Sequence, residues 1–93
     1  MKPKVTIGVC VKNAEATIED AVESILLQDF PHAQMEVIFV DDGSKDKTLS
    51  VIADNIPRMD IKTQVYSGPW KGLGKTRNLV VDNATGDYIV WVD

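Results

Sequence analysis

The chain has 93 residues, of which 44% are hydrophobic and 26% are charged, and its formal net charge is -4. This length and composition predict one small globular domain, because the apolar fraction is too high for a disordered segment. The ten Lys and Arg residues are scattered, so the sequence predicts no nucleic-acid partner and no attraction to anionic lipid. The longest apolar runs are well short of the roughly 18 residues of a membrane span, and we expect a cytoplasmic domain.

The first two predicted elements are a strand and an amphipathic helix. Residues 4–11 are mostly β-branched or apolar, as in a central strand, and Gly8 in their middle indicates close approach by another element. In residues 14–30 apolar side chains recur at helical spacing, and acidic residues gather in the N-terminal half. This pattern predicts a helix that begins near Asn13 or Thr17.

The next strand ends on two adjacent carboxylates. Residues 35–40 are almost wholly apolar, as in a strand that is buried on both faces, and the run stops at Asp41 and Asp42. Residues 43–44, Gly-Ser, then turn the chain into a second predicted helix at 46–56. Ligands of open α/β sheets bind outside the carboxyl ends of the strands, so this pair marks the first place to look for a site.

The rest of the chain continues the alternation. A half-buried strand at 61–66, a helix at 73–84 and a final strand at 87–92 complete the order β-α-β-α-β-α-β. This order predicts a three-layer, Rossmann-like α/β fold with a mostly parallel sheet and helices on both faces. In such a fold the carboxyl ends of the strands gather polar groups along one edge. The groups gathered there are Lys12, Asn13, Asp41, Asp42, residues 68–75 and Asp93.

These groups together suit a nucleoside diphosphate. A carboxylate at a strand end accepts hydrogen bonds from a nucleobase N–H or a ribose hydroxyl, and two carboxylates hold a hard divalent cation. Such a cation bridges phosphate oxygens and stabilises charge on a departing diphosphate. Arg77, near the start of the third predicted helix, carries a planar guanidinium that suits phosphate or a base.

Five segments, in order along the chain, resemble the family-2 glycosyltransferases, which have the GT-A fold and use nucleotide-sugar donors. Because they span the whole chain, the resemblance is far more specific than Asp-Asp-Gly-Ser alone would be. The segments are residues 7–13, residues 24–28, residues 40–44 followed by Asp46 and Thr48, Gly72 with Arg77 and Asn78, and residues 84–89. Two positions depart from the family pattern, because Lys12 replaces a Tyr that would stack on the base and Trp70 replaces an Asn.

The resemblance implies that residues 1–93 are one domain, the N-terminal nucleotide-binding part of a longer glycosyltransferase domain. The activity implied is an inverting transfer of a sugar from a UDP-sugar or GDP-sugar to an acceptor hydroxyl, with Mg²⁺ or Mn²⁺ as the cofactor. The acceptor implied is a saccharide or a lipid, bound through sequence that would follow Asp93.

The same resemblance implies roles for individual residues. The carboxylate that matches Asp42 binds the nucleobase, and Arg77 helps to hold the donor. Asp93 matches the first carboxylate of an Asp-x-Asp motif and contacts the ribose or the metal. The remaining residues that flank the nucleotide are Val11, Lys12 and Asn13. Asp41 is expected to shape the turn or cap the following helix instead.

The resemblance implies that the second carboxylate of the metal motif, and the part of the fold that holds the acceptor and the catalytic base, would follow Asp93, so the catalytic base stays unassigned. We therefore expect a fragment that is inactive alone and that has exposed edges through which it could form a homo-oligomer. The full-length parent is expected in the cytoplasm or peripherally at the inner face of the membrane.

Two other functional classes stay open. A non-enzymatic domain of the same fold would bind a nucleotide or a partner without turnover. A P-loop nucleoside triphosphatase would use residues 70–76, Trp-Lys-Gly-Leu-Gly-Lys-Thr. That motif requires Gly at position 69, where Pro69 stands, and Gly68 comes one residue too early.

Two isolated residues are given structural interpretations. His32 has no second His or Cys near it in the sequence and is expected to be a solvated surface residue rather than a metal ligand. Cys10, within the first predicted strand, is interpreted as a buried thiol.

Overall fold

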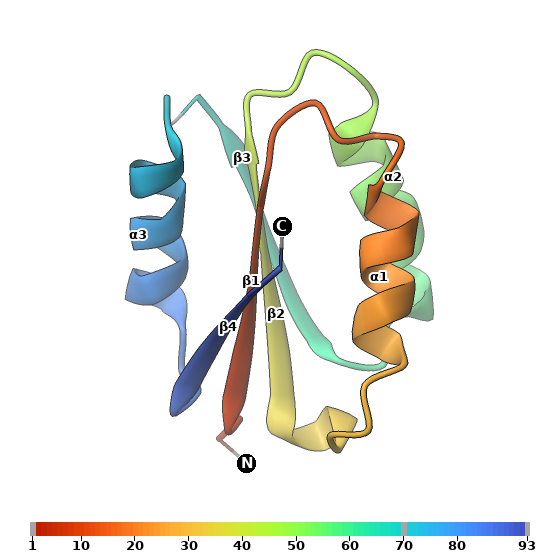
Figure 1. Cartoon of the computed structure of the whole chain (residues 1–93), viewed down its shortest axis with the longest axis vertical. Helices are drawn as coiled ribbons and strands as arrows, with labels where there is room; N and C mark the ends of the chain where they lie inside the picture. The colour runs from red at the N-terminus through yellow and green to blue at the C-terminus, as the bar shows by residue number, and fades with distance from the viewer. Residues whose placement is uncertain (1, 70, 93) are drawn as a thin grey trace.

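Four strands alternate with three helices in residues 2–69 and 71–92, the part of the chain that the computed structural model describes (Figure 1). In chain order the elements are β1 (Val5–Val11), α1 (Ile18–Leu26), the 3-10 turn η1 (His32–Gln34), β2 (Met35–Asp42), α2 (Thr48–Asn55), the 3-10 turn η2 (Ile56–Arg58), β3 (Lys62–Gly68), α3 (Leu73–Asn83) and β4 (Tyr88–Val92). None of the helices in these ranges is long and apolar enough to cross a membrane.

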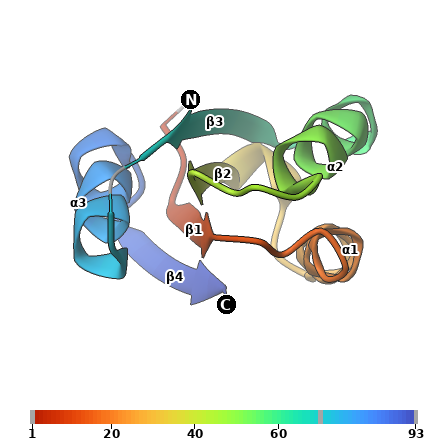
Figure 2. The same ribbon diagram turned by 90° about the horizontal axis from the view of Figure 1, so that it is seen from above.

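The strands form one parallel sheet in the order β3-β2-β1-β4. Figure 2 shows α1 and α2 on one face of the sheet and α3 on the other. The predicted three-layer, Rossmann-like α/β fold is therefore confirmed. Because the strands are parallel, the loops that follow β1, β2 and β3 all lie at one edge of the sheet, which is the upper edge in Figure 1.

The hydrophobic core is built around β2, whose successive side chains point to opposite faces of the sheet. Val37 and Phe39 pack in the layer beneath α1 and α2, whereas Ile38 and Val40 pack against Val80 of α3. All five side chains are fully buried. Burying one side chain of this size contributes about 1.5–3 kcal/mol, so the central strand anchors both layers.

Gly8 lies where β1 is approached most closely from the α3 face. A Cβ atom at this position would lie 2.7 Å from Trp91 Cζ3 and 2.9 Å from Val80 Cγ1, both closer than carbon atoms can pack. The close approach predicted from Gly8 is therefore confirmed. The indole of Trp91 occupies the space that a side chain at position 8 would need.

Several element boundaries differ from the prediction, and the largest difference is that α1 ends at Leu26 and not at residue 30. Two of the other differences have identifiable reasons. β2 extends through Asp41 and Asp42, because β3 also runs on to Gly68 and continues the pairing with them. α1 begins only at Ile18, because the N–H groups of Asn13 and Ala14 are bonded to the segment after β2 and residues 15–17 form a single turn that leads into the helix. Apolar periodicity alone did not show that competing set of bonds.

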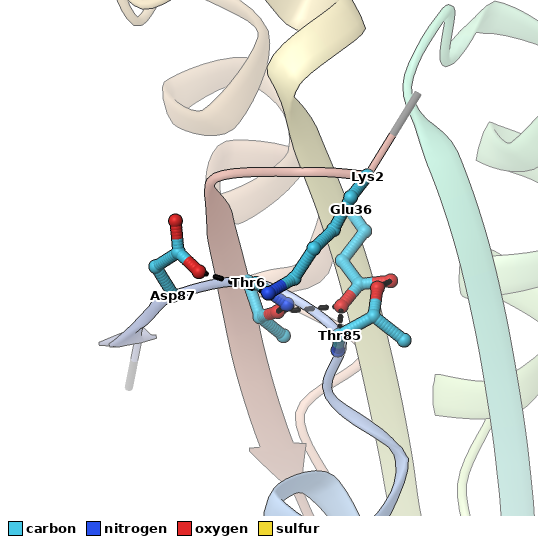
Figure 3. Close-up of polar contacts among 6 residues, drawn as sticks. Lys2, Thr6, Glu36, Thr85 and Asp87 are labelled. Atoms are coloured by element: carbon cyan, nitrogen blue, oxygen red, sulfur yellow. Dashed lines mark hydrogen bonds and ion pairs between the residues drawn. The ribbon is translucent and has the colours of Figure 1, made fainter.

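A buried carboxylate joins three segments at the amino end of the sheet (Figure 3). Glu36 is 1% exposed. Its Oε2 accepts hydrogen bonds from the Thr6 hydroxyl at 2.5 Å and from the Thr85 backbone N–H at 2.6 Å, and its Oε1 accepts one from the Thr85 hydroxyl at 3.0 Å. Burial opposes the charged form, but these bonds outweigh it and lower the pKa of Glu36. The cluster ties β4 to both β1 and β2.

Gly86 fits closely against β1 beside this cluster. Its backbone N–H donates to Thr6 Oγ1 at 3.1 Å. A Cβ atom at position 86 would lie 2.8 Å from the backbone nitrogen of Thr6 and 2.9 Å from the carbonyl carbon of Val5. Backbone atoms of a central strand have little freedom to move, so this position requires glycine.

His32 is more enclosed than its sequence context predicted, with a side chain that is 27% exposed. Its Nδ1 lies 2.7 Å from Asp60 Oδ1, and its Nε2 lies 3.2 Å from the carbonyl oxygen of Leu26. Both partners are acceptors, and only the imidazolium form donates from both nitrogens. The bond to Asp60 accordingly raises the pKa of His32.

Candidate functional site

A cavity of 510 Å³ opens at the carboxyl edge of the sheet. Three of the residues predicted from the sequence to flank a ligand line it: Val11, Lys12 and Asp42. The other lining residues are Cys10 of β1 and a group at the start of α3, namely Lys71, Gly72, Leu73 and Thr76. Residues 71–73 belong to the segment 68–75 that was predicted to lie at this edge, but Thr76 was not predicted. Cys10 is only partly buried, so its interpretation as a buried thiol was wrong.

Asp42 connects the end of β2 to the loop that precedes α3. Its Oδ1 accepts the backbone N–H of Lys71 at 2.9 Å, and its Oδ2 accepts the N–H of Gly72 at 2.9 Å. Both donors lie in a turn with positive φ, 60° at Lys71 and 140° at Gly72. A non-glycine residue in this region costs about 1–3 kcal/mol, which the two charge-assisted bonds to Asp42 offset.

Asp41 points to the opposite face of the sheet, because successive strand residues alternate. Its side chain is buried, and its Oδ1 accepts hydrogen bonds from both the backbone N–H and the hydroxyl of Ser44. Gly43, between them, has a φ of 64°. The prediction that Asp41 shapes the turn is confirmed, and the two adjacent carboxylates have separate tasks.

The segment after β2 also holds the segment after β1. Ser44 Oγ accepts the N–H of Asn13 at 2.8 Å, Thr48 Oγ1 accepts the N–H of Ala14 at 2.7 Å, and Asp46 Oδ2 accepts the N–H of Glu15 at 3.3 Å. We call Ser44, Asp46 and Thr48 the loop lock.

The loop lock is linked internally by the Thr48 hydroxyl, which donates to Asp46 Oδ1. This bond, together with backbone N–H groups, lowers the pKa of Asp46. Ordering one residue costs about 1–2 kcal/mol, whereas one hydrogen bond contributes only about 0.5–1.5 kcal/mol. Several bonds together are therefore required to offset the cost of ordering the segment after β1.

Asn13 also links the two segments, but here the side chain belongs to the segment after β1 and the backbone N–H to the segment after β2. Its Oδ1 accepts the N–H of Lys45 at 2.8 Å, and its own backbone has a φ of 51°. The structure thus directs this side-chain oxygen to the neighbouring loop, and Asn13 is not among the residues that line the cavity. A contact between Asn13 and a nucleotide stays a prediction.

Arg77 lies on α3 and stacks on β4. Its Cζ is 5.2 Å from the centroid of the Trp91 ring, a cation–π contact worth about 0.5–2 kcal/mol. Its Nε is buried and has no hydrogen-bond partner among the described residues.

The neighbouring Thr76 donates its hydroxyl to the Leu73 carbonyl oxygen at 2.9 Å. In a P-loop that hydroxyl would face a cation, so the bond speaks against the triphosphatase alternative.

The predicted metal ligand Asp93 lies outside the described residues, as does Trp70. Across residues 2–69 and 71–92, no group of three or more His, Cys, Asp or Glu side chains is placed to hold a metal ion. The described carboxylates therefore do not complete a metal site by themselves.

A second cavity of 240 Å³ lies between α1 and the sheet. Its lining is mainly apolar, with Ser24 and Gln28 as the polar members and no ionisable side chain. The carboxyl-edge cavity, which Asp42, Lys12 and Lys71 line, has the groups that recognise a polar ligand.

Comparison with protein families supplies the evolutionary context. The family model described as Glycosyl transferase family 2 matches residues 6–93. The chain belongs to this family. It is 32% identical over 90 residues to the poly(ribitol-phosphate) beta-N-acetylglucosaminyltransferase TarS of Staphylococcus aureus. It is also 33% identical over 94 residues to a poly(ribitol-phosphate) beta-glucosyltransferase of Bacillus spizizenii. The matches cover 97% of this chain but only 16% and 14% of those relatives.

Solved structures of the family share the fold. Residues 1–349 of S. aureus TarS in complex with UDP-GlcNAc match with a TM-score of 0.83 and 32% identity, over 97% of this chain and 26% of that one. The mannosyltransferase PcManGT of Pyrobaculum calidifontis, in complex with GDP-Man and Mn²⁺, matches with a TM-score of 0.83 and 28% identity, over 96% and 26%. The expected GT-A relationship is thus shown for this part of the fold.

Proposed function

We propose that the chain binds the nucleotide of a nucleoside-diphosphate sugar and forms the donor-binding part of an inverting glycosyltransferase. The observation that carries this proposal is the position of Asp42, whose carboxylate lines the carboxyl-edge cavity and is fixed there by the backbone of Lys71 and Gly72. Family membership and the UDP-GlcNAc and GDP-Man complexes of two relatives support it.

Asp42 gives the cavity a chemical preference among bases. A carboxylate only accepts hydrogen bonds. Uracil and guanine present a ring N–H on their pairing edge, whereas cytosine and adenine present an unprotonated ring nitrogen at the same position. A hydrogen bond to a charged group is worth about 1.5–3 kcal/mol, so we expect UDP or GDP to bind more tightly than CDP or ADP.

Positive side chains are proposed to serve the diphosphate. Lys12 and Lys71 both line the cavity, whereas Arg77 of α3 is not among the lining residues and would have to leave its contact with Trp91 to reach a ligand there. Lys12 stands where the family often has a Tyr that stacks on the base. The Lys12 ammonium would attract the diphosphate by its charge instead of stacking on the base. Binding of the diphosphate should therefore weaken as the salt concentration rises.

A divalent cation, Mg²⁺ or Mn²⁺, is proposed for the glycosyltransferase, with Asp93 as one of its ligands. The Mn²⁺ in the PcManGT complex supports the use of a cation, and the choice of Asp93 comes from the family resemblance. When bound, such an ion would supply positive charge that stabilises the leaving diphosphate. Asp42, by contrast, is engaged with backbone N–H groups, which suits a base-reading role better than a metal-binding one.

The transfer itself is proposed to move the sugar to an acceptor hydroxyl of a saccharide or a lipid. The 93-residue chain spans about a sixth of the length of TarS, and we expect it to bind donor nucleotide without turning it over. Family membership favours this enzymatic origin over a non-enzymatic binding domain.

Calorimetric titration of the 93-residue chain with UDP, GDP, CDP and ADP tests the proposal. We expect UDP or GDP to bind best, and Asp42→Asn to weaken that binding by about tenfold or more, since the amide places a donor where the base N–H would point. Asp54→Asn, at an exposed position on α2, is the matched control. Equal binding of all four nucleotides, or an Asp42→Asn protein that is folded and binds normally, would refute the role of Asp42. The same titrations with Mn²⁺ on Asp93→Asn test the cation.

A further inference from the structure

The loop lock joins two walls of the carboxyl-edge cavity. Val11 and Lys12 line one wall, and the next residue is Asn13, whose N–H the lock holds. Asp42, at the end of the neighbouring strand β2, lines a second wall and is followed, after Gly43, by Ser44. The lock therefore ties the two walls together immediately beyond the residues that face the cavity.

We propose that Ser44, Asp46 and Thr48 are positioning residues for the nucleoside diphosphate. They hold the cavity at its binding width before the ligand arrives, and they touch no ligand atom themselves. This inference rests on the proposed function and extends it to side chains outside the cavity lining. Preorganised sites bind more tightly because the cost of ordering the loop is met during folding rather than during binding.

The bonds of the lock also limit where the phosphates can lie. The N–H groups of Asn13, Ala14 and Glu15 are already bonded to protein oxygens, and the last of these is a carboxylate oxygen of Asp46. A phosphate at this position would have to displace Asp46 and would be repelled by its charge. The segment after β1 therefore supports Val11 and Lys12 instead of cradling phosphate.

Thr48 is the centre of the lock. Its side chain is fully buried, and the hydroxyl both accepts the N–H of Ala14 and donates to Asp46. Thr6 has the same chemistry at the other end of the sheet: it is fully buried, it accepts the N–H of Gly86, and it donates to Glu36. Thr48→Val and Thr6→Val thus remove equivalent bonds at the two ends, with little change of shape.

The experiment compares these two variants at a temperature where both are folded by circular dichroism. We expect Thr48→Val to weaken binding of UDP or GDP about fivefold, the effect of one lost hydrogen bond, and Thr6→Val to leave it unchanged. Hydrogen exchange at the Ala14 amide should accelerate only in Thr48→Val. Thr48→Ser, which keeps the hydroxyl, should restore both affinity and protection.

Each outcome is informative. Normal nucleotide binding by folded Thr48→Val, or equal weakening in Thr6→Val, would overturn the positioning role alone. Absence of nucleotide binding by the unmodified chain would overturn the proposed function and this inference with it. If Thr48→Val does not fold, Ser44→Ala replaces it, because it removes the acceptor of the Asn13 N–H from a less buried position. Ser50→Ala, exposed on α2, is its control.

Discussion

Thr48 and Thr6 hold opposite ends of one sheet with the same set of bonds, yet their surroundings differ. At the carboxyl end, the bonded segments continue directly into the walls of a 510 Å³ cavity, and Asp46 remains partly exposed. At the amino end, the carboxylate of Glu36 is buried and its bonds close on β1 and β4. Identical local chemistry therefore serves stability alone at one end and, by our proposal, ligand affinity at the other.

The largest effect should come from Glu36→Ala. This change leaves the buried Thr6 hydroxyl without its acceptor, which costs about 1–3 kcal/mol. It also removes the two bonds from the more exposed Thr85 to a charged group, each worth about 1.5–3 kcal/mol. We expect a loss of about 3–5 kcal/mol in the free energy of unfolding, measured in urea. Glu36→Gln, which keeps one acceptor oxygen, should lose less. A Glu36→Ala protein as stable as the unmodified chain would show that the bonds from Thr6 and Thr85 to Glu36 do not stabilise the fold.

Gly86→Ala should have the next largest effect on stability. The new Cβ would press on backbone atoms of Val5 and Thr6, and overpacking of this kind costs about 1–3 kcal/mol. Gly74→Ala is the opposite case, because nothing lies within 4 Å of its added Cβ and it stands inside α3. There we expect about 0.5–1 kcal/mol of stabilisation. Thermal melts of both variants should move in opposite directions, and two shifts of the same sign would contradict the packing argument.

The smallest effect should be a pH dependence from His32, also at the amino end. Its folded-state pKa is raised above the usual 6.5, so its stabilising contribution is fully present below that value and is lost as the pH rises through the folded-state pKa. His32→Gln should therefore cost stability at pH 5.5 and progressively less toward pH 8. Nucleotide affinity measured over the same range should show no matching change, because His32 is remote from the carboxyl edge. A change of nucleotide affinity over the same pH range would contradict the view that the amino end of the sheet does not affect ligand binding.

Acid should act on Glu36 in the opposite sense to its effect on His32. Because the folded-state pKa of Glu36 is lowered, its contribution is present above the usual value of 4.5 and is lost as the pH falls through the folded-state pKa. The contribution of Glu36 to the free energy of unfolding is therefore lost only at pH values where the contribution of His32 is fully present.

The alternation of strand-like and helix-like hydrophobic patterns along the chain predicted the fold correctly, because each strand and helix leaves its own local pattern. The separate role of Asp42 came from the family resemblance, whereas the turn role of Asp41 could be predicted because Gly43 and Ser44 follow it directly. The alternation also predicted that Lys12, Asp42 and residues 68–75 lie at one edge, because parallel strands bring their ends together, and the family resemblance added Val11.

Contacts that span long sequence distances were missed. Glu36 was taken as one more residue of a buried strand, although a charged side chain there needs partners, and those partners lie 30 and 49 positions away. The cavity wall formed by Lys71, Gly72 and Leu73 depends on two positive φ angles that the residue types only partly suggest. The direction of the Asn13 side chain likewise depends on the neighbouring loop.

The contacts of Trp91 with Gly8 and Arg77 make the fluorescence of Trp91 a probe of ligand binding. The missing side chain at Gly8 lets the indole lie against β1, and the Cζ of Arg77 lies 5.2 Å from the centroid of the same ring. Because indole emission is sensitive to a nearby cation, any ligand that draws Arg77 toward the carboxyl edge would change the fluorescence of Trp91. A Trp70→Phe background would leave Trp91 as the only emitting indole.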